Sequence, residues 1–393
     1  MPKVLVLIVT HNAMKWIQRC LESVLDSQGQ SLQFVMEVMV VDNASDDGTS
    51  AYISKHFPSV RVQRQLKNFG FGRANNLGLN YAVRHEFDHV FLLNQDAYVE
   101  KGTIAELVQA QMEHPEYLVV SPVHMDGNGE DLDSKFAGYI ADNRVLQEAV
   151  GLFGREKEKK KKREGEKERR SEGESETKHK CESTQSLGVD REWEEKHKHR
   201  KMRSLLTDIE SEASETEPSA KERRGENEKE RRRENEVVVP VDFVNAAAWM
   251  LSRNALRLVG GFHPAIFMYA EDNNYVHRIH HAGFLVGVLP SSTIYHDRQD
   301  RPVPEGTAKL FRNFKINASI TITNPTISGW KKLTKTTKLL FKASGSRLKR
   351  GHPDALILFF RMLIFSIGIS INALKTPTPT NDFPFLETST ENK

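Results

Sequence analysis

The chain has 393 residues, enough for one large domain or two of medium size, and its formal charge of +3 at pH 7 is close to balance. Near-neutrality argues against a dedicated nucleic-acid binder, because that function depends on a large positive field. Two cysteines, Cys20 and Cys181, exclude a disulfide framework and favour a reducing, cytosolic compartment. The apolar run Val4–Val9 is too short for a secretion signal or a membrane span, so we expect neither at this position.

The first 115 residues alternate short β-rich runs with helical patterns. The apolar runs are continuous, which is typical of strands buried on both faces of a sheet. The alternation therefore predicts βαβ units and a parallel sheet covered by helices. The predicted strands are Val4–Val9, Met36–Val41, Val60–Gln65 and Val90–Leu93, and the predicted helices are Met14–Leu25, Thr49–Phe57, Phe71–Arg84 and Thr103–Gln111.

A charged tract separates two stretches of ordinary globular composition. Residues 155–236 hold 25 Lys or Arg and 24 Asp or Glu in 82 positions, so about 60% of them are charged. Such a segment has no apolar face to bury, and we expect a disordered, solvated insertion within one domain. The sequence leaves the function of this insertion open.

Regular patterning resumes after the charged tract. Residues 237–252 predict a strand, a turn and a second strand. Two short helices and another strand then follow at Arg253–Leu258, Asn273–His281 and Phe284–Leu289. We therefore expect the α/β pattern to continue on this side of the tract.

The C-terminal region combines a basic stretch with an apolar one. Trp330–Arg350 carries eight Lys or Arg and no acid, and Ala355–Ile371 is apolar apart from Arg361 and a few small residues. Seventeen residues with an internal arginine are marginal for a membrane span, so an amphipathic or buried helix is favoured. Residues 330–371 could bind an anionic membrane surface or pack on the body of the protein.

Polar residues follow each of the four predicted strands of the first half. In an open parallel sheet, ligands bind at the carboxyl ends of the strands. Thr10, His11 and Asn12 follow the first strand, Asp42 closes the second, Asn68–Asn76 follows the third and Asp96 the fourth. Their shared position predicts one binding site at this edge of the sheet.

Each of these features also has a purely structural interpretation. Asp42 through Asp47 could form an Asx turn and cap the next helix, and Asp96 could be an ordinary loop carboxylate. Glu271 and Asp272 could likewise only cap the helix that follows them. Gly70-Phe71-Gly72 is not a dinucleotide fingerprint, because it follows the third strand and Asn stands at the third glycine position.

Six motifs in register resemble those of family 2 glycosyltransferases. They are VTHN (9–12), VVDNASDDGT (40–49), NFGFGRANNLG (68–78), LLNQDAYV (92–99), GGFHPAIFMYAEDNNY (260–275) and IYHDR (294–298). The likeness covers residues 1–150 and 237–300 and is closest to the bacterial rhamnosyltransferase-like members that build surface polysaccharides. It implies a GT-A fold, an α/β domain whose first half binds a nucleotide-sugar and whose second half receives the acceptor.

Joined to the patterning, the resemblance divides the chain into four parts. We expect a nucleotide-sugar-binding half (1–154), the charged insertion (155–236), an acceptor and catalytic half (237–325), and a basic and apolar helical extension (326–393).

The resemblance also implies roles for individual residues. By position, these are base recognition by Asp42 flanked by Thr10 and Asn12, donor binding by Asn68, Gly70 and Arg73, metal binding by Asp96 and His296, and general-base catalysis by Asp272. Two departures from the family pattern stand out. The DxD motif reads Asn94-Gln95-Asp96 and so keeps one acid, and the acids often found after Glu271-Asp272 are replaced by Asn273 and Asn274.

These residues lead us to expect an inverting glycosyltransferase that requires Mn²⁺ or Mg²⁺. It would move a hexosyl or deoxyhexosyl group from a nucleotide-sugar donor to a glycan or a lipid-linked glycan, as a cytoplasmic protein peripheral to the inner face of the membrane. No nucleic-acid partner is expected. A nucleotidyltransferase is a second hypothesis, although VTHNAMKW (9–16) lacks the glycine-rich loop that holds a triphosphate. A non-catalytic nucleotide-sugar-binding scaffold is the third.

Overall fold

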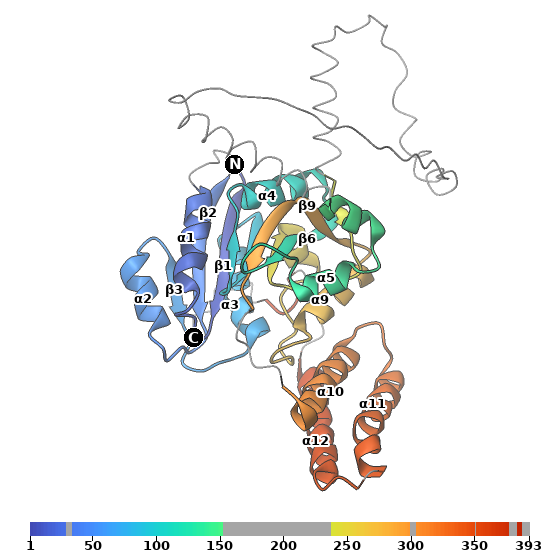
Figure 1. The fold of residues 1–393 in the computed structure, drawn as a ribbon. Coiled ribbons are helices and arrows are strands. Elements are labelled where there is room, and N and C mark those ends of the chain that lie inside the picture. The colour runs from blue at the N-terminus through green and yellow to red at the C-terminus, as the bar shows by residue number, and fades with distance from the viewer. Residues whose placement is uncertain (29–33, 152–236, 299–303, 350, 377–382, 387–393) are drawn as a thin grey trace, which may run out of the picture. The chain divides into compact units, whose positions relative to one another are not determined.

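The computed structural model describes residues 1–28, 34–151, 237–298, 304–349, 351–376 and 383–386, and within them nine strands form one sheet. The strand order is β3-β2-β1-β4-β8-β6-β9-β5, and β7 pairs with β9 (Figure 1). The strands are β1 (Lys3–Thr10), β2 (Val35–Asp42), β3 (Arg61–Arg64), β4 (His89–Asn94), β5 (Ala97–Val99), β6 (Tyr117–Asp126), β7 (Val239–Pro240), β8 (Ala248–Ser252) and β9 (Leu285–His296).

The sheet is mixed but mostly parallel, as the fold class predicted. Strand β1 pairs in parallel with β2 and β4, β2 with β3, and β6 with β9. Strand β8 runs antiparallel between β4 and β6. Because β8 follows the charged tract and β4 and β6 precede it, residues on both sides of the tract build one sheet. The tract itself lies outside the described residues, and the boundaries of the four predicted parts stay a prediction.

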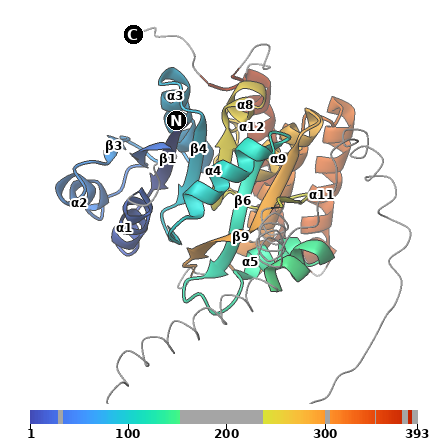
Figure 2. The same cartoon turned by 90° about the horizontal axis from the view of Figure 1, so that it is seen from above.

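Helices cover both faces of the sheet (Figure 2). The alternating side chains of β1 show the two layers: Val4, Val6 and Ile8 pack with α1, α2 and α4, whereas Leu5 and Leu7 pack with α3, α8 and α9. The described helices are α1 (Ile17–Gln28), α2 (Thr49–His56), α3 (Phe71–Arg84), α4 (Thr103–Glu113), α5 (Ser134–Ile140), α8 (Arg253–Leu258), α9 (Glu271–His281), α10 (Gly306–Thr323), α11 (Gly329–Lys349) and α12 (Ala355–Lys375).

The strongly patterned elements agree with prediction, and the differences have identifiable causes. Helices α3 and α8 have the predicted bounds, whereas β9 runs seven residues past its predicted end at Leu289, to His296. Its second half follows a break in the register with β6 between Pro122 and Val123. Strand β6 contains that proline, and no expectation covered this strand, β5, α5 or α10. Each of these elements is short, or held by tertiary contacts more than by local pattern.

Helices α10, α11 and α12 lie side by side (Figure 1), and they share a small hydrophobic core of their own. The buried members of this core are Phe314, Ala318, Ile322, Leu340, Leu358, Met362 and Ile369. Among the described helices, α12 has the length and apolar composition needed to cross a membrane, with a mean hydropathy of 2.0 over its most apolar window. The C-terminal extension is therefore helical, as expected.

Candidate functional site

The predicted edge of the sheet carries a cavity of about 600 Å³. The register of the strands explains its position, because Thr10 at the end of β1 lies opposite Asp42 at the end of β2, and Val9 opposite Asn94 of β4. The loops after these strands form one wall, and residues that follow the charged tract form the other. The polar and charged lining comprises His11, Asn12, Asn43, Asn68, Asn94, Gln95, Asp96, Lys135, Asn245, Glu271, Asp272, Asn273, Arg298 and Arg312.

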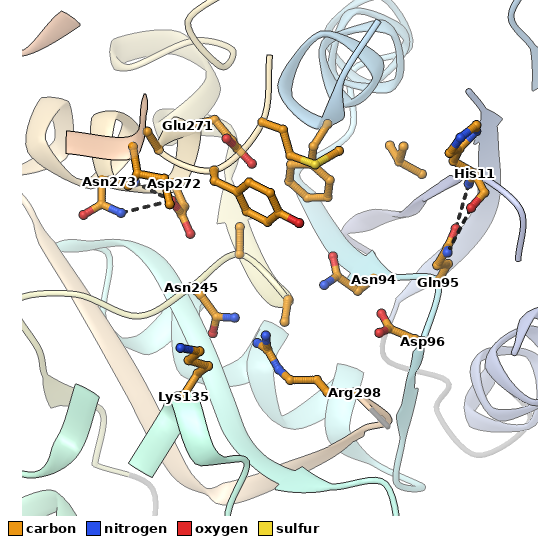
Figure 3. A pocket seen from close by; sticks show the side chains of 18 of the residues that line it. His11, Asn94, Gln95, Asp96, Lys135, Asn245, Glu271, Asp272, Asn273 and Arg298 are labelled. Atoms are coloured by element: carbon orange, nitrogen blue, oxygen red, sulfur yellow. Dashed lines mark hydrogen bonds between the residues drawn. The ribbon is translucent and has the colours of Figure 1, made fainter. Parts of the chain in front are cut away.

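Four of the nine predicted site residues line this cavity: Asn12, Asn68, Asp96 and Asp272. Asp96 and Asp272 come from opposite sides of the charged tract, yet they face the same space (Figure 3). The structure therefore brings together two acids that lie 176 positions apart in the sequence. The other five are outside the lining and are described one group at a time below.

Asp42 and Thr10 form a buried polar group behind the cavity wall. Both side chains are fully buried, and Thr10 Oγ1 donates a hydrogen bond to Asp42 Oδ1 at 3.0 Å. The Ser45 hydroxyl donates to the same oxygen, and Arg64 lies 3.8 Å from the other one. Asp42 thus stabilises the turn after β2 without capping α2, whose N-cap is Gly48. Recognition of a base by Asp42 stays a prediction.

The segment after β3 is fixed to the opposite wall by backbone contacts. Asn68 Oδ1 accepts hydrogen bonds from Asn43 Nδ2 and from the Gly70 amide, each at 2.8 Å. Gly70 has a φ of +83°, and a Cβ atom there would lie 1.9 Å from the carbonyl oxygen of Phe267. This close approach requires glycine. The motif glycine therefore has a structural role at the join of the two walls.

Arg73 has a structural partner away from the cavity. Its Nε donates a hydrogen bond to the carbonyl oxygen of Pro264 at 2.6 Å, which joins α3 to the loop before α9. The donor-binding role implied for Arg73 stays untested.

In the reduced DxD motif, the side chains of Gln95 and Asp96 make different contacts. Gln95 bridges to the loop after β1: its Oε1 accepts from the His11 amide at 2.7 Å, and its Nε2 donates to the His11 carbonyl at 3.3 Å (Figure 3). Asp96 instead faces His296, with 3.5 Å between Asp96 Oδ1 and His296 Nε2. The middle position thus ties two loops together and adds no charge to the cavity.

Asp96 and His296 are the residues that could hold a divalent cation. Their 3.5 Å separation is close to the roughly 3 Å between adjacent ligands of an octahedral Mg²⁺. Within the described part of the chain, no group of three His, Cys, Asp or Glu side chains could hold a metal ion. A cation at this pair would have to take most of its ligands from a diphosphate and from water, as Mg²⁺ often does, and metal binding here stays a prediction.

A buried carboxylate lies behind this pair. Asp133 accepts hydrogen bonds from the amides of Lys135 and Phe136 and so caps α5. Its Oδ2 is 3.7 Å from His296 Nδ1 and 2.6 Å from Arg298 Nε. These contacts fix the guanidinium of Arg298, which projects into the cavity with Lys135 (Figure 3). The positive charges of Lys135 and Arg298 thus lie near the negative charges of Asp96 and Asp133.

The first turn of α9 supplies two carboxylates to the cavity. Glu271 and Asp272 open this helix, and Tyr275, Val276 and Ile279 form its buried side, as predicted. Burial raises the pKa of Asp272 above its ordinary value, although two hydrogen bonds from Asn273 oppose the rise. Burial, and then the charge of Asp272, raise the pKa of Glu271 as well. Asp272 therefore has a stronger affinity for a proton than an exposed aspartate has.

Neither Glu271 nor Asp272 is the N-cap residue of this helix, although both lie in its first turn. Its N-cap is Ala270, which has no side-chain capping bond, and Asp272 Oδ1 accepts instead from the backbone and side chain of Asn273. Glu271 Oε2 is buried without a hydrogen-bond partner among the described residues. Both residues line the cavity.

The position of α9 depends on a buried arginine. Arg278 donates to Asn274 Oδ1 at 3.0 Å and to the carbonyls of Val259 and Gly261. Burial lowers the pKa of Arg278 to about 10. These hydrogen bonds join the helix that carries Asp272 to the loop before it, so Asp272 is held on a rigid element.

Sequence reasoning missed several residues of the cavity. Lys135 had no signal, because it belongs to the unpredicted helix α5. Arg298 was within reach, since it ends the motif IYHDR, but no role was attached to it. Asn245 lies with these two cations on one side of the cavity (Figure 3).

Comparison with known proteins finds a family likeness in the first part of the chain. The model of the family described as "Glycosyl transferase family 2" matches residues 5–171. No curated protein matches the chain. The narrower likeness to rhamnosyltransferase-like members stays a prediction, because none of these findings points to that sugar.

Solved structures give distant likenesses. TarS residues 1-349 from S. aureus has 14% identity and a TM-score of 0.43, over 95% of this chain and 81% of that one. The mannosyltransferase PcManGT from Pyrobaculum calidifontis, in complex with GDP-Man and Mn²⁺, has 15% identity and a TM-score of 0.45, over 96% and 88%. GalNAc-T7 with UDP, GalNAc and Mn²⁺ has 13% identity and a TM-score of 0.45, over 87% and 55%.

The family match includes the strands and loops that form one wall of the cavity. The chain is on this ground similar to family 2 glycosyltransferases over residues 5–171, and it builds the mixed, mostly parallel α/β sheet expected for such a chain.

Proposed function

We propose that the protein is an inverting, metal-dependent glycosyltransferase in which Asp272 is the general base. The observation that carries the proposal is the shared cavity of Asp272 and Asp96, which presents a proton acceptor and an anionic metal ligand to one space. The acceptor is a hydroxyl group of a glycan or a lipid-linked glycan, and the transferred group is a hexosyl or deoxyhexosyl unit. The cytosolic face of a membrane is the proposed place of the reaction.

The reaction is a single displacement at the anomeric carbon of the donor sugar. Asp272 takes the proton of the acceptor hydroxyl, whose oxygen forms the new bond to C1. The bond from C1 to the diphosphate oxygen breaks on the opposite side, and the nucleoside diphosphate leaves with that electron pair. One displacement inverts C1, and no second carboxylate is needed as a nucleophile. General-base catalysis of this kind contributes about 10²–10⁴-fold.

Negative charge develops on the leaving diphosphate, and the cavity holds groups that oppose it. Lys135 and Arg298 project into the cavity beside Asp96, and Asp133 fixes the guanidinium of Arg298 (Figure 3). We assign both cations to the diphosphate. Asp96 and His296 would hold Mn²⁺ or Mg²⁺, which when bound neutralises phosphate charge without a proton transfer. The cations compensate in part for the acid that the DxD motif lacks.

A panel of nucleotide-sugars tests the proposal. UDP-, dTDP- and GDP-sugars are added with Mn²⁺ in a thermal-shift assay, because a ligand that binds the folded state raises the melting temperature. A donor that stabilises the protein is then incubated with candidate acceptors, and release of its nucleoside diphosphate is measured with and without EDTA. Stabilisation by no donor would contradict the proposal.

A pyrophosphate assay and the donor assay together separate the alternatives. A nucleotidyltransferase would form pyrophosphate from a sugar phosphate and a nucleoside triphosphate. A non-catalytic scaffold would bind a donor without transferring or hydrolysing its sugar. We favour glycosyl transfer over both, because the carboxyl groups of Asp272 and Asp96 line the same cavity.

A further inference from the structure

The helices that follow the sheet carry a surface that glycosyl transfer does not explain. Helices α10, α11 and α12 contact the sheet-bearing part near α9, where Asn274 Nδ2 donates to the carbonyl oxygen of Thr323 at 2.9 Å. Arg312 of α10 also lies over the ring of Tyr269 in the cavity wall, 4.5 Å from its centroid. The three helices are thus joined to the site, and their remaining faces are open.

Helix α12 is apolar on both of its sides. One side packs in the three-helix core through Leu358, Met362 and Ile369. The opposite side exposes large apolar side chains at steps of three and four residues, which places them in one stripe along the helix. The members of the stripe are Ile357, Phe360, Ile364, Ile367, Ile371 and Leu374, which are 45–86% exposed, and Leu356 lies beside it at 61%.

The apolar stripe continues onto α11 through aromatic rings in edge-on and tilted contact. Phe360 contacts Phe359 at 5.7 Å between ring centroids, and Phe359 contacts Phe341 of α11 at 5.8 Å. Phe341 is 58% exposed, and Trp330, eleven residues earlier, lies three helical turns away on the same side and is 74% exposed. A single apolar surface therefore extends over both helices.

A row of lysines borders this surface on α11. Lys331, Lys335, Lys338 and Lys342 recur at steps of four, three and four residues and are exposed, so they form one stripe along the helix. Residues 305–376 hold thirteen Lys or Arg and two Asp or Glu, whereas the whole chain has a net charge of only +3. An excess of positive charge therefore lies in the same helices as the exposed apolar stripe.

We propose that α11 and α12 form a docking surface for anionic lipid membranes, with α12 lying in the plane of the interface. Apolar side chains of such a helix enter the boundary between headgroups and acyl chains, and neighbouring lysines pair with anionic headgroups. The inner side of α12 is already packed on α10 and α11, and Arg361 lies over Phe311 of α10, 4.6 Å from the ring centroid. These contacts favour a helix that lies on the membrane over one that crosses it.

A second copy of the chain fits the surface less well. Self-association through α12 would bring two lysine-bordered surfaces together, and like charges at close range oppose such pairing. An anionic lipid surface instead complements the lysines while it buries the apolar stripe. The charge pattern therefore selects the membrane as the partner.

Vesicle flotation of the full chain tests this proposal. We compare vesicles of phosphatidylcholine alone with vesicles that contain equal parts of phosphatidylcholine and phosphatidylglycerol. Binding to the anionic vesicles is expected, with a marked decrease at high salt, because salt screens the lysines. The double change Lys335→Glu and Lys338→Glu should weaken binding by about fivefold or more for each lysine.

The apolar half of the surface is tested by Ile364→Glu with Ile367→Glu. Both side chains are more than half exposed, so folding should be retained, and a loss of binding of tenfold or more is expected. Met112→Glu on α4 and Lys55→Glu on α2 are the matched controls at exposed positions elsewhere, and they should bind as the wild type does. An unchanged melting temperature confirms that each variant is folded.

Three results would overturn the proposal. The first is the absence of binding to anionic vesicles by the wild type. The second is equal binding to neutral vesicles, which would remove the role of the lysines. The third is a concentration-dependent dimer in light scattering that Ile364→Glu with Ile367→Glu abolishes, without vesicle binding, which would assign the surface to a second copy. None of these results depends on the role of Asp272, so failure here leaves the proposed reaction standing.

Discussion

Lys135 offers a direct test of the proposal that the cavity binds a diphosphate. It is an exposed residue of α5, in the second position after the N-cap Asp133, and its side chain projects into the cavity beside Arg298 (Figure 3). A charge-assisted contact of this kind contributes about 1.5–3 kcal/mol, and an exposed lysine belongs at the lower end. Lys135→Met should therefore weaken binding of a nucleoside diphosphate by roughly tenfold.

Isothermal titration calorimetry measures this effect on the nucleoside diphosphate of the donor that stabilises the protein. The matching nucleoside, which lacks phosphate, should bind both forms equally, and Lys55→Met on α2 is the control for loss of one surface lysine. Lys135 is a cleaner target than Arg298, because removal of Arg298 also leaves the buried carboxylate of Asp133 without its cation. If Lys135→Met weakened binding of the nucleoside and of the nucleoside diphosphate equally, or weakened neither, Lys135 would not contact the diphosphate.

Three further outcomes follow from the same structure. The pKa of Glu271 is raised in the folded state, so its stabilising contribution is complete below the ordinary value of 4.5 and is lost as pH rises through the folded pKa. Glu271→Gln should therefore be more stable than the wild type by roughly 1 kcal/mol or more in urea unfolding at alkaline pH. A stability difference between the two proteins that does not change with pH would argue against a buried acid. Gly78→Ala should cost about 1–3 kcal/mol, since its Cβ would lie 2.2 Å from Leu7 Cδ1, whereas Gly138→Ala meets nothing within 4 Å and should be neutral or stabilising in thermal unfolding. EDTA should lower release of nucleoside diphosphate by about a hundredfold or more, with recovery on addition of Mn²⁺, and full activity in EDTA would count against a metal at Asp96 and His296.

The sheet of the first half could be predicted because its signals are local and strong. Val4–Val9 and Met36–Val41 are continuous apolar runs, and turn residues separate them from helices with a clear apolar side. Parallel pairing then places Thr10 opposite Asp42 without any further information. The location of the site at this edge follows from the topology alone.

The detail of the site could not be predicted, because it depends on contacts between distant segments. The burial of Asp42 arises from Thr10 and Ser45, which the fold brings to its carboxylate. Lys135 enters the cavity from a helix with a weak local pattern. Pro122 in β6 obscures that strand, since proline is unusual within a sheet.

The six motifs located more of the site than the patterning did. They pointed to Asp96 and Asp272 on opposite sides of the charged tract, and both acids line the cavity. They did not separate residues that face a ligand from residues that hold the loops, as Gly70 and Arg73 show. A sequence motif therefore contains both ligand-facing residues and residues that stabilise the loops, and the sequence alone does not distinguish them.

Asp272→Asn is the most direct test of general-base catalysis by Asp272, because it removes the proposed base and keeps the shape of the side chain. Sugar transfer and donor binding are measured on the same preparation. We expect the rate of sugar transfer to fall by about 10²–10⁴-fold relative to the wild type, while the dissociation constant of the donor stays within about threefold. Transfer near the wild-type rate, or a parallel loss of donor binding, would contradict the assignment of Asp272 as the general base.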